Sequence, residues 1–199
     1  AAFQKVWYSD TDPVMDYVRE YIDTSAVLGV DKDLKARFLL PMMEGKETCR
    51  FVNASSAVDQ TRGVKDAEEQ EKMRAASRIN DQAIKRLRGL VKEGITEKEI
   101  ADQLLGIYQE LGAEDFSFPP IVSFGANAAD PHHMPDATVL REGDAVLFDV
   151  GCVKDGYCSD MTRTFYYKEA TDKNREIYEL VRRANEAAIA KIKPGVPLC

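Results

Sequence analysis

The segment from residue 144 to residue 165 places a tight turn between two strand-like runs, and it limits the possible folds of this chain more than any other. Its central dipeptide, Asp155-Gly156, is typical of two-residue hairpin turns, because both central residues of a type I′ turn need positive φ. A turn centred there pairs Asp149 with Thr162. Opposite residues, and every second residue along a strand, share one face. The segment therefore predicts a β-hairpin in which Asp149 and Asp160 are diagonal neighbours on the same side.

Two carboxylates on one face of a buried hairpin repel each other and lose hydration unless a partner compensates them. Residues 145–150 form an apolar run of strand length that contains Asp149, so we expect this hairpin to be buried. Mn²⁺, Co²⁺ or Zn²⁺ accept such ligands, and bridging carboxylates hold ion pairs in hydrolytic centres. Alternatively, one aspartate caps a turn and the other is hydrogen-bonded to Thr162 or Thr164. The hairpin alone leaves a metal site and a structural role open.

Motifs outside the hairpin extend this pattern. They are Arg62-Gly-Val-Lys-Asp66, the Glu-rich helix start that follows it, the histidine-containing segment 121–135, Phe148-Asp-Val-Gly151, and Ser159-Asp-Met-Thr-Arg-Thr-Phe165. In their order and spacing, these motifs resemble the creatinase, prolidase and aminopeptidase P family of metallopeptidases. The resemblance runs from about Trp7 to Pro194. It implies a pita-bread catalytic domain preceded by a smaller N-terminal domain.

The resemblance also implies roles for three residues. Asp149 would chelate one ion of a dinuclear metal site, and Asp160 would bridge both ions. His132, the first histidine after Pro131, matches the family's substrate-binding histidine, which would donate a hydrogen bond to the scissile amide region or to the developing oxyanion. His133 receives no role. Without the family pattern, the favoured interpretation of both histidines is an exposed loop dipeptide.

The family site needs three more ligands, one histidine and two glutamates, which lie beyond the hairpin. No histidine follows His133, and the later glutamates fall in or beside a helical pattern that begins at Thr171, which predicts surface positions. The chain also begins without Met and stops at Cys199. We therefore expect an internal fragment with an incomplete site for two divalent ions and no activity by itself.

The spacing of apolar residues predicts two parts and an α+β fold class. The first part, residues 1–61, alternates helices and strands, and the resemblance identifies it as the remainder of a creatinase/prolidase-type N-terminal domain. The second, residues 62–199, would be the first half of the pita-bread domain, with exposed apolar surface where the other half packs. Helices are expected at 12–22, 32–44, 66–91, 96–111 and from Thr171, and strands at 26–30, 48–52, 121–124, 145–153 and 157–167.

Composition narrows the classes of partner. The 199 residues are 44% hydrophobic and 31% charged, with a net charge of -7. An acidic chain lacks the basic face that nucleic acid requires, and no apolar run approaches the roughly 20 residues that span a bilayer.

The four cysteines lack the CxxC spacing of zinc sites, and the hairpin register places Cys152 and Cys158 on opposite faces. We expect reduced thiols, a cytoplasmic homodimer, and neither nucleic acid nor membrane as a partner.

The activity implied by the resemblance is metal-dependent hydrolysis of Xaa-Pro peptide bonds by the whole protein, as an Xaa-Pro dipeptidase or aminopeptidase. Two alternatives are a pita-bread module that has lost catalysis and binds peptides or proteins, and a creatinase-like amidinohydrolase, which needs no metal. Intact ligand carboxylates at Asp149 and Asp160 argue against both alternatives. Arg163, on the face opposite Asp160, is expected to pair with an acidic residue.

Overall fold

The structure, a computed structural model, describes residues 5–9, 11–23, 25, 27–44 and 49–197. It divides into two compact units, Ala1–Lys65 and Asp66–Cys199, which we describe separately. The division lies beyond the expected boundary at Arg62, because helix α3 (Ser55–Gly63) still runs through that residue. That helix was not predicted. Only Ser55 of it is buried, so no apolar periodicity marks it in the sequence.

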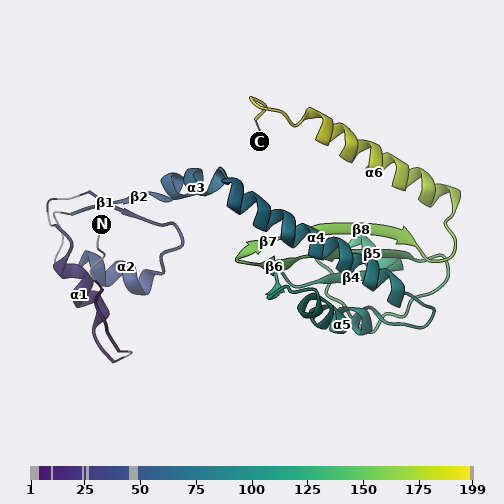
Figure 1. The fold of residues 1–199 in the computed structure, drawn as a ribbon, viewed down its shortest axis with the longest axis horizontal. Coiled ribbons are helices and arrows are strands. Elements are labelled where there is room, and N and C mark those ends of the chain that lie inside the picture. The colour runs from purple at the N-terminus through teal and green to yellow at the C-terminus, as the bar shows by residue number, and fades with distance from the viewer. Residues whose placement is uncertain (1–4, 10, 24, 26, 45–48, 198–199) are drawn as a thin grey trace. The chain divides into compact units, whose positions relative to one another are not determined.

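The first unit pairs two short strands with short helices (Figure 1). Strand β1 (Val27–Val30) runs parallel to β2 (Arg50–Asn53), and the helices that precede each strand are α1 (Val14–Glu20) and α2 (Ala36–Met43). Each helix begins later than predicted. Pro13 is the N-cap residue of α1, so the helix begins only at Val14. Before α2, Asp31 accepts the backbone N–H groups of Asp33 and Leu34 in a turn, and the helix begins after this turn. Ala26 and Thr48, where two strands were expected to begin, lie outside the described residues.

The second unit combines helices with two small antiparallel sheets, which confirms the α+β class (Figure 1). Its two central helices end shortly before Gly94 and Gly112, which both have positive φ. The order of strands is β4-β5-β8 in one sheet and β3-β6-β7 in the other. The elements are α4 (Ala67–Leu90), α5 (Glu97–Glu110), β3 (Asp115–Phe116), β4 (Ile121–Phe124), the 3₁₀ helix η1 (Gly125–Ala129), β5 (Ala145–Val150), β6 (Cys152–Lys154), β7 (Tyr157–Cys158), β8 (Met161–Tyr166) and α6 (Asp172–Lys191).

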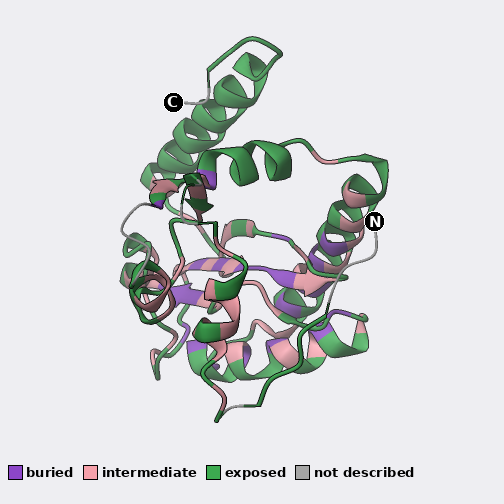
Figure 2. Ribbon diagram, turned by 90° about the vertical axis from the view of Figure 1, so that its left-hand side faces the viewer, coloured by how far each residue is buried: buried purple, intermediate pink, exposed green. Residues whose placement is uncertain are grey.

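The core lies between α4, α5 and one face of the β4-β5-β8 sheet. Strand β5 alternates strictly between half-buried and buried residues, as expected of a strand covered on one face. Figure 2 shows the buried segments gathered along this sheet and the helices beside it. The residues that fill the core include Leu87, Ile100, Leu104, Tyr108, Val122, Phe124, Val146, Phe148 and Val150.

A buried polar bridge joins the helices to the sheet. The Tyr108 hydroxyl donates to Asn80 Oδ1 at 2.7 Å, and Asn80 Nδ2 donates to the carbonyl oxygen of Val150 at 2.8 Å. Burial raises the pKa of Tyr108 well above its usual range, so its hydroxyl remains a donor. Since buried polar groups are costly when unpaired, this bridge fixes α4, α5 and the end of β5 in one arrangement.

The hairpin has the register that its turn predicts. Asp149 pairs with Thr162, and the turn residues Asp155 and Gly156 both have positive φ, 50° and 76°. The two expected long strands are each divided in two, the first at Gly151, between β5 and β6, and the second at residues 159–160, between β7 and β8. Cys152 is buried and Cys158 is exposed, and both are free thiols. Cys199 lies outside the described residues.

Helix α6 begins directly after Thr171, where a helix was expected to start, and Thr171 Oγ1 accepts the backbone N–H of Asn174 at 3.1 Å. It contains no buried residue, and Figure 2 shows it exposed along its length. Within the described ranges, no helix combines the length and the apolar content that crossing a membrane requires.

Candidate metal and substrate site

Asp149 and Asp160 lie on the face of the β4-β5-β8 sheet that α4 and α5 leave uncovered. Asp149 projects opposite to the buried Phe148 and Val150, and Asp160 lies in the break between β7 and β8. Asp149 is half-buried and Asp160 is exposed. The expectation of a buried hairpin is therefore wrong for this face, because the helices cover only the other one.

The two aspartates interact electrostatically. Partial burial, and then the negative charge and hydrogen bonding of Asp149, raise the pKa of Asp160. Thr162 Oγ1 donates to Asp149 Oδ1 at 2.9 Å, which is the bond that the structural alternative anticipated. Among the described residues, no lysine or arginine forms an ion pair with either aspartate. A pair of adjacent carboxylates without a cationic partner has the donor chemistry that divalent metal ions prefer.

Close backbone packing holds both aspartates in register. Gly151 lies between β5 and β6, and a Cβ atom there would stand 2.0 Å from the Ser159 carbonyl oxygen and 2.3 Å from Ser117 Oγ. The same Ser117 Oγ donates to the Ser159 carbonyl at 2.8 Å, and the Ser117 N–H donates to the Gly151 carbonyl at 3.0 Å. These bonds fix the backbone that follows Asp149 and precedes Asp160.

His132 lies on the loop after η1, and its side chain is exposed. Its backbone N–H donates to Asp130 Oδ1 at 2.9 Å. Within the described residues, the imidazole has no hydrogen-bonded or ionic partner, and nothing bonds it to Asp149 or Asp160. The structure thus brings the two aspartates together and leaves His132 free to meet a ligand from solvent.

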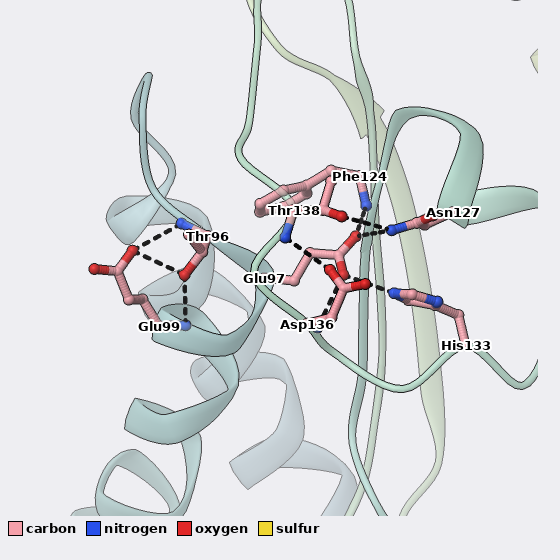
Figure 3. Close-up of polar contacts among 8 residues, drawn as sticks. All are labelled: Thr96, Glu97, Glu99, Phe124, Asn127, His133, Asp136 and Thr138. Atoms are coloured by element: carbon pink, nitrogen blue, oxygen red, sulfur yellow. Dashed lines mark hydrogen bonds and ion pairs between the residues drawn. The ribbon is translucent and has the colours of Figure 1, made fainter.

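A second cluster was not predicted as a site (Figure 3). Glu97, in the first turn of α5, is fully buried, and its Oε2 lies 2.6 Å from Nε2 of His133. The backbone N–H of Asp136 donates to the same oxygen at 3.2 Å. The other oxygen, Oε1, accepts the Phe124 N–H at 2.7 Å and Asn127 Nδ2 at 3.0 Å.

Possible ligand atoms of Glu97, His133 and Asp136 lie within 4.8 Å of one another, so the three residues form a potential metal site. Their hydrogen bonds argue against that use. Each oxygen of Glu97 already accepts two hydrogen bonds, and Thr138 holds Asp136 Oδ1 through its backbone N–H at 2.7 Å. Bonds from Thr138 also lower the pKa of Asp136. We interpret the cluster as structural, because a metal ion would have to displace most of these donors.

Sequence reasoning missed Glu97 because it lies inside a capping box. Thr96 and Glu99 form that box: Thr96 Oγ1 accepts the Glu99 N–H at 3.1 Å, and Glu99 Oε2 accepts the Thr96 N–H at 2.8 Å. An acidic residue in a first helical turn normally faces solvent.

Arg163 was expected to pair with an acidic residue, and this expectation is wrong. Its Nη1 donates to the Thr162 carbonyl at 2.8 Å, and no ion pair to it occurs within the described ranges.

A groove of about 830 Å³ lies beside the aspartates, over the same open sheet face. Its lining includes Leu147 and Thr164 from the sheet and Ile177 and Val181 from α6. Thr162, which holds Asp149, also lines the groove. The carboxylates themselves do not line it.

Comparison with known sequences adds the family. Residues 71–199 match the model of Metallopeptidase family M24. The Bacillus subtilis protein YkvY is 40% identical over 147 residues, which are 74% of this chain and 40% of that protein. An uncharacterized peptidase of Staphylococcus aureus is 36% identical over 157 residues, or 79% of this chain and 45% of the relative. The chain therefore spans less than half the length of these curated relatives.

Solved structures share the fold over nearly the whole chain. A prolidase from Thermococcus sibiricus is 31% identical, with a TM-score of 0.87 over 96% of this chain and 54% of that one. An Xaa-Pro dipeptidase from Bacillus anthracis is 30% identical, with a TM-score of 0.86 over 94% of this chain and 53% of that one. These similarities confirm the expected resemblance and the pita-bread type of α+β fold.

Proposed function

The chain belongs to Metallopeptidase family M24, and on that premise we propose that it forms part of a metal-dependent peptidase that cleaves Xaa-Pro bonds. Membership of this family implies divalent metal ions, and the names of the similar solved structures include prolidase and Xaa-Pro dipeptidase. In this proposal, residues 1–61 are the remainder of the N-terminal domain, and residues 62–199 are the first half of the catalytic domain. The whole protein would also contain a second half of the catalytic domain, because the matched part of this chain covers only 40% of YkvY and 53% of the Bacillus anthracis dipeptidase.

The observation that carries the proposal is the pair of carboxylates on the open sheet face. Asp149 and Asp160 would hold two divalent ions, Mn²⁺, Co²⁺ or Zn²⁺, with the missing ligands supplied by the second half. Partial burial, and then the negative charge of Asp149, raise the pKa of Asp160, and a cation between the two carboxylates would relieve both effects. Neither carboxylate has an ionic partner among the described residues, so both are available as ligands.

Each residue of the chain would have a distinct task. When bound, the metal ions supply activation of water and polarisation of the scissile carbonyl. Thr162 keeps Asp149 oriented through its 2.9 Å hydrogen bond. His132, exposed and unpaired among the described residues, would donate a hydrogen bond to the substrate near the scissile amide or to the developing oxyanion.

We expect the whole protein, supplied with Mn²⁺, to hydrolyse Ala-Pro in preference to Ala-Ala. Asp149→Asn and Asp160→Asn should each abolish turnover and weaken metal binding, because each substitution removes a charged ligand. The measurements are dipeptide hydrolysis and metal titration by calorimetry. Asp155→Asn is the matched control, since it removes one negative charge from the turn of the same hairpin without touching the pair.

Equal hydrolysis of Ala-Pro and Ala-Ala would contradict the proposed Xaa-Pro specificity. Full activity in either ligand variant would remove the metal assignment. Metal binding without hydrolysis of any dipeptide would favour the alternative of a non-catalytic peptide-binding module.

A further inference from the structure

Glu97 is the one fully buried acidic side chain in the described part of the chain. Burying a carboxylate is costly unless hydrogen bonds or charges compensate it. Four donors do so here, and the positive end of the α5 dipole adds to them. The proposed reaction uses none of these groups directly, so this arrangement needs a separate explanation.

All four donors belong to the segment from Phe124 to Asp136, which contains η1 and the histidine loop (Figure 3). Phe124 and Asn127 bind one carboxylate oxygen, and His133 and Asp136 bind the other. A single buried group therefore holds this segment on both sides of the loop position occupied by His132.

The cluster also distinguishes the two neighbouring histidines. A carboxylate only accepts hydrogen bonds, so the His133 nitrogen that faces Glu97, Nε2, must carry a proton and donate. That side chain is only 15% exposed. His132 differs from it because its imidazole is exposed and has no partner among the described residues.

We propose that Glu97 is a positioning residue that anchors the segment 124–136 and thereby determines where the imidazole of His132 meets the substrate. His133 acts within this anchor and does not contact the substrate through Nε2. This proposal rests on the proposed function, because it requires that His132 bind the substrate.

The test uses Glu97→Gln, which keeps the shape of the side chain but replaces an acceptor oxygen with a donor NH₂ group. In either orientation of the amide, a backbone N–H, that of Phe124 or of Asp136, then faces a donor. Glu99→Gln is the matched control. It makes the same charge change in the same helical turn, and the side-chain bonds of Glu99 go to Thr96 and not to the histidine loop.

The first readout is amide hydrogen exchange in this chain, which needs neither metal nor substrate. We expect exchange of one backbone amide, that of Phe124 or that of Asp136, to speed up about tenfold or more in Glu97→Gln, because the amide that faces the new NH₂ group loses its hydrogen bond. Glu99→Gln should leave the segment 124–136 unchanged. Wild-type exchange of this segment in Glu97→Gln would overturn the anchor.

The second readout is a double-mutant cycle in the whole protein with Ala-Pro as substrate. Glu97→Gln should lower kcat/KM about 10- to 100-fold, as expected of a misplaced substrate-binding group. The same change made in a His132→Ala background should cost almost nothing further. If the fold losses in kcat/KM of the two single variants multiply in the double variant, Glu97 does not act through His132, and the proposal is overturned.

Failure of the proposed function is distinguishable from failure of the anchor. Full activity in His132→Ala would remove the substrate role of His132, and this inference with it, even if Glu97→Gln speeds up exchange. If Glu97→Gln does not fold, His133→Leu and His133→Gln replace it, since the first removes one donor and the second retains one. We expect slow amide exchange of the segment 124–136 in His133→Gln and faster exchange in His133→Leu. Equal exchange of this segment in the two variants would overturn the anchor.

Discussion

At the scale of single residues, the site depends on positions that leave no room for substitution. Gly151 is such a position. Its backbone lies so close to Ser159 and Ser117 that an added Cβ atom would collide with the Ser159 carbonyl oxygen and the Ser117 hydroxyl. The two aspartates lie next to this contact in the chain, Asp149 shortly before Gly151 and Asp160 directly after Ser159. The need for glycine here comes from close approach, and not from a left-handed backbone conformation.

We expect Gly151→Ala to lower the free energy of unfolding by about 1–3 kcal/mol, because the added methyl group must displace packed backbone. The measurement is urea unfolding of the chain followed by circular dichroism. Gly89→Ala is the control: it lies in α4, and apart from the adjacent backbone of its own helix no atom lies within 4 Å of the added Cβ, so it should stabilise the chain by up to about 1 kcal/mol. Equal stability of Gly151→Ala and the wild type would contradict the packing argument.

At the scale of elements, the helices differ in how much their caps matter. Helix α5 begins with a complete capping box and contributes Ile100, Leu104 and Tyr108 to the core. Helix α6 also has a threonine cap, at Thr171, but contains no buried residue. Loss of a cap should therefore affect global stability only where the helix is part of the core.

Thr96→Ala should lower the unfolding free energy by about 1 kcal/mol, the usual cost of losing a threonine N-cap. Thr171→Ala removes the equivalent cap from α6 and should leave the main unfolding transition unchanged, since α6 can fray without opening the core. Unfolding in urea measures both. A shift of the transition in Thr171→Ala as large as that in Thr96→Ala would show that α6 folds cooperatively with the core.

The α5 cap also predicts a dependence on pH. A hydrogen bond from the Thr96 backbone N–H lowers the pKa of Glu99 below its ordinary value of 4.5. Stability from this bond is therefore present above that value and is lost as the pH falls through the lowered pKa. We expect the difference in Tm between the wild type and Glu99→Gln to disappear in acid. A difference that persists at acid pH would contradict this.

At the scale of the whole molecule, the second unit has an apolar surface that nothing in the described chain covers. Leu180 and Val181 of α6 are 59% and 62% exposed, and the groove beside α6 runs over the open sheet face. Exposed apolar patches of this kind usually mark surfaces that pack against a partner. In the proposed whole protein, the second half of the catalytic domain would be that partner.

We expect this chain by itself to associate at increasing concentration and to hydrolyse no Ala-Pro, because two carboxylates cannot retain two metal ions in water at useful affinity. Val181→Lys should reduce association, since it places a charge within the exposed apolar surface. Glu176→Lys, a charge change at an exposed α6 position whose wild-type side chain is already polar, is the control. Light scattering during size-exclusion chromatography measures both. A monodisperse monomer for the wild type at all concentrations would contradict the expectation.

The sequence by itself determined the features that depend on local interactions. Asp155-Gly156 and strand alternation specify the hairpin register, and with it the pairing of Asp149 with Thr162. The spacing of apolar residues and the capping box predicted α4 and α5 to within a few residues. These signals arise from neighbouring residues, so a single sequence is sufficient to read them.

Only the tertiary structure decided which surfaces are covered. The aspartates lie on an open face because α4 and α5 pack against the other one, and Glu97 is buried because a segment 27 to 39 residues further along the chain folds over the start of α5. In the sequence, Glu97 and Glu99 are acids of one helical turn, and nothing in their spacing marks Glu97 as the buried one. Their different burial depends on contacts between distant segments, which local propensity and spacing do not specify.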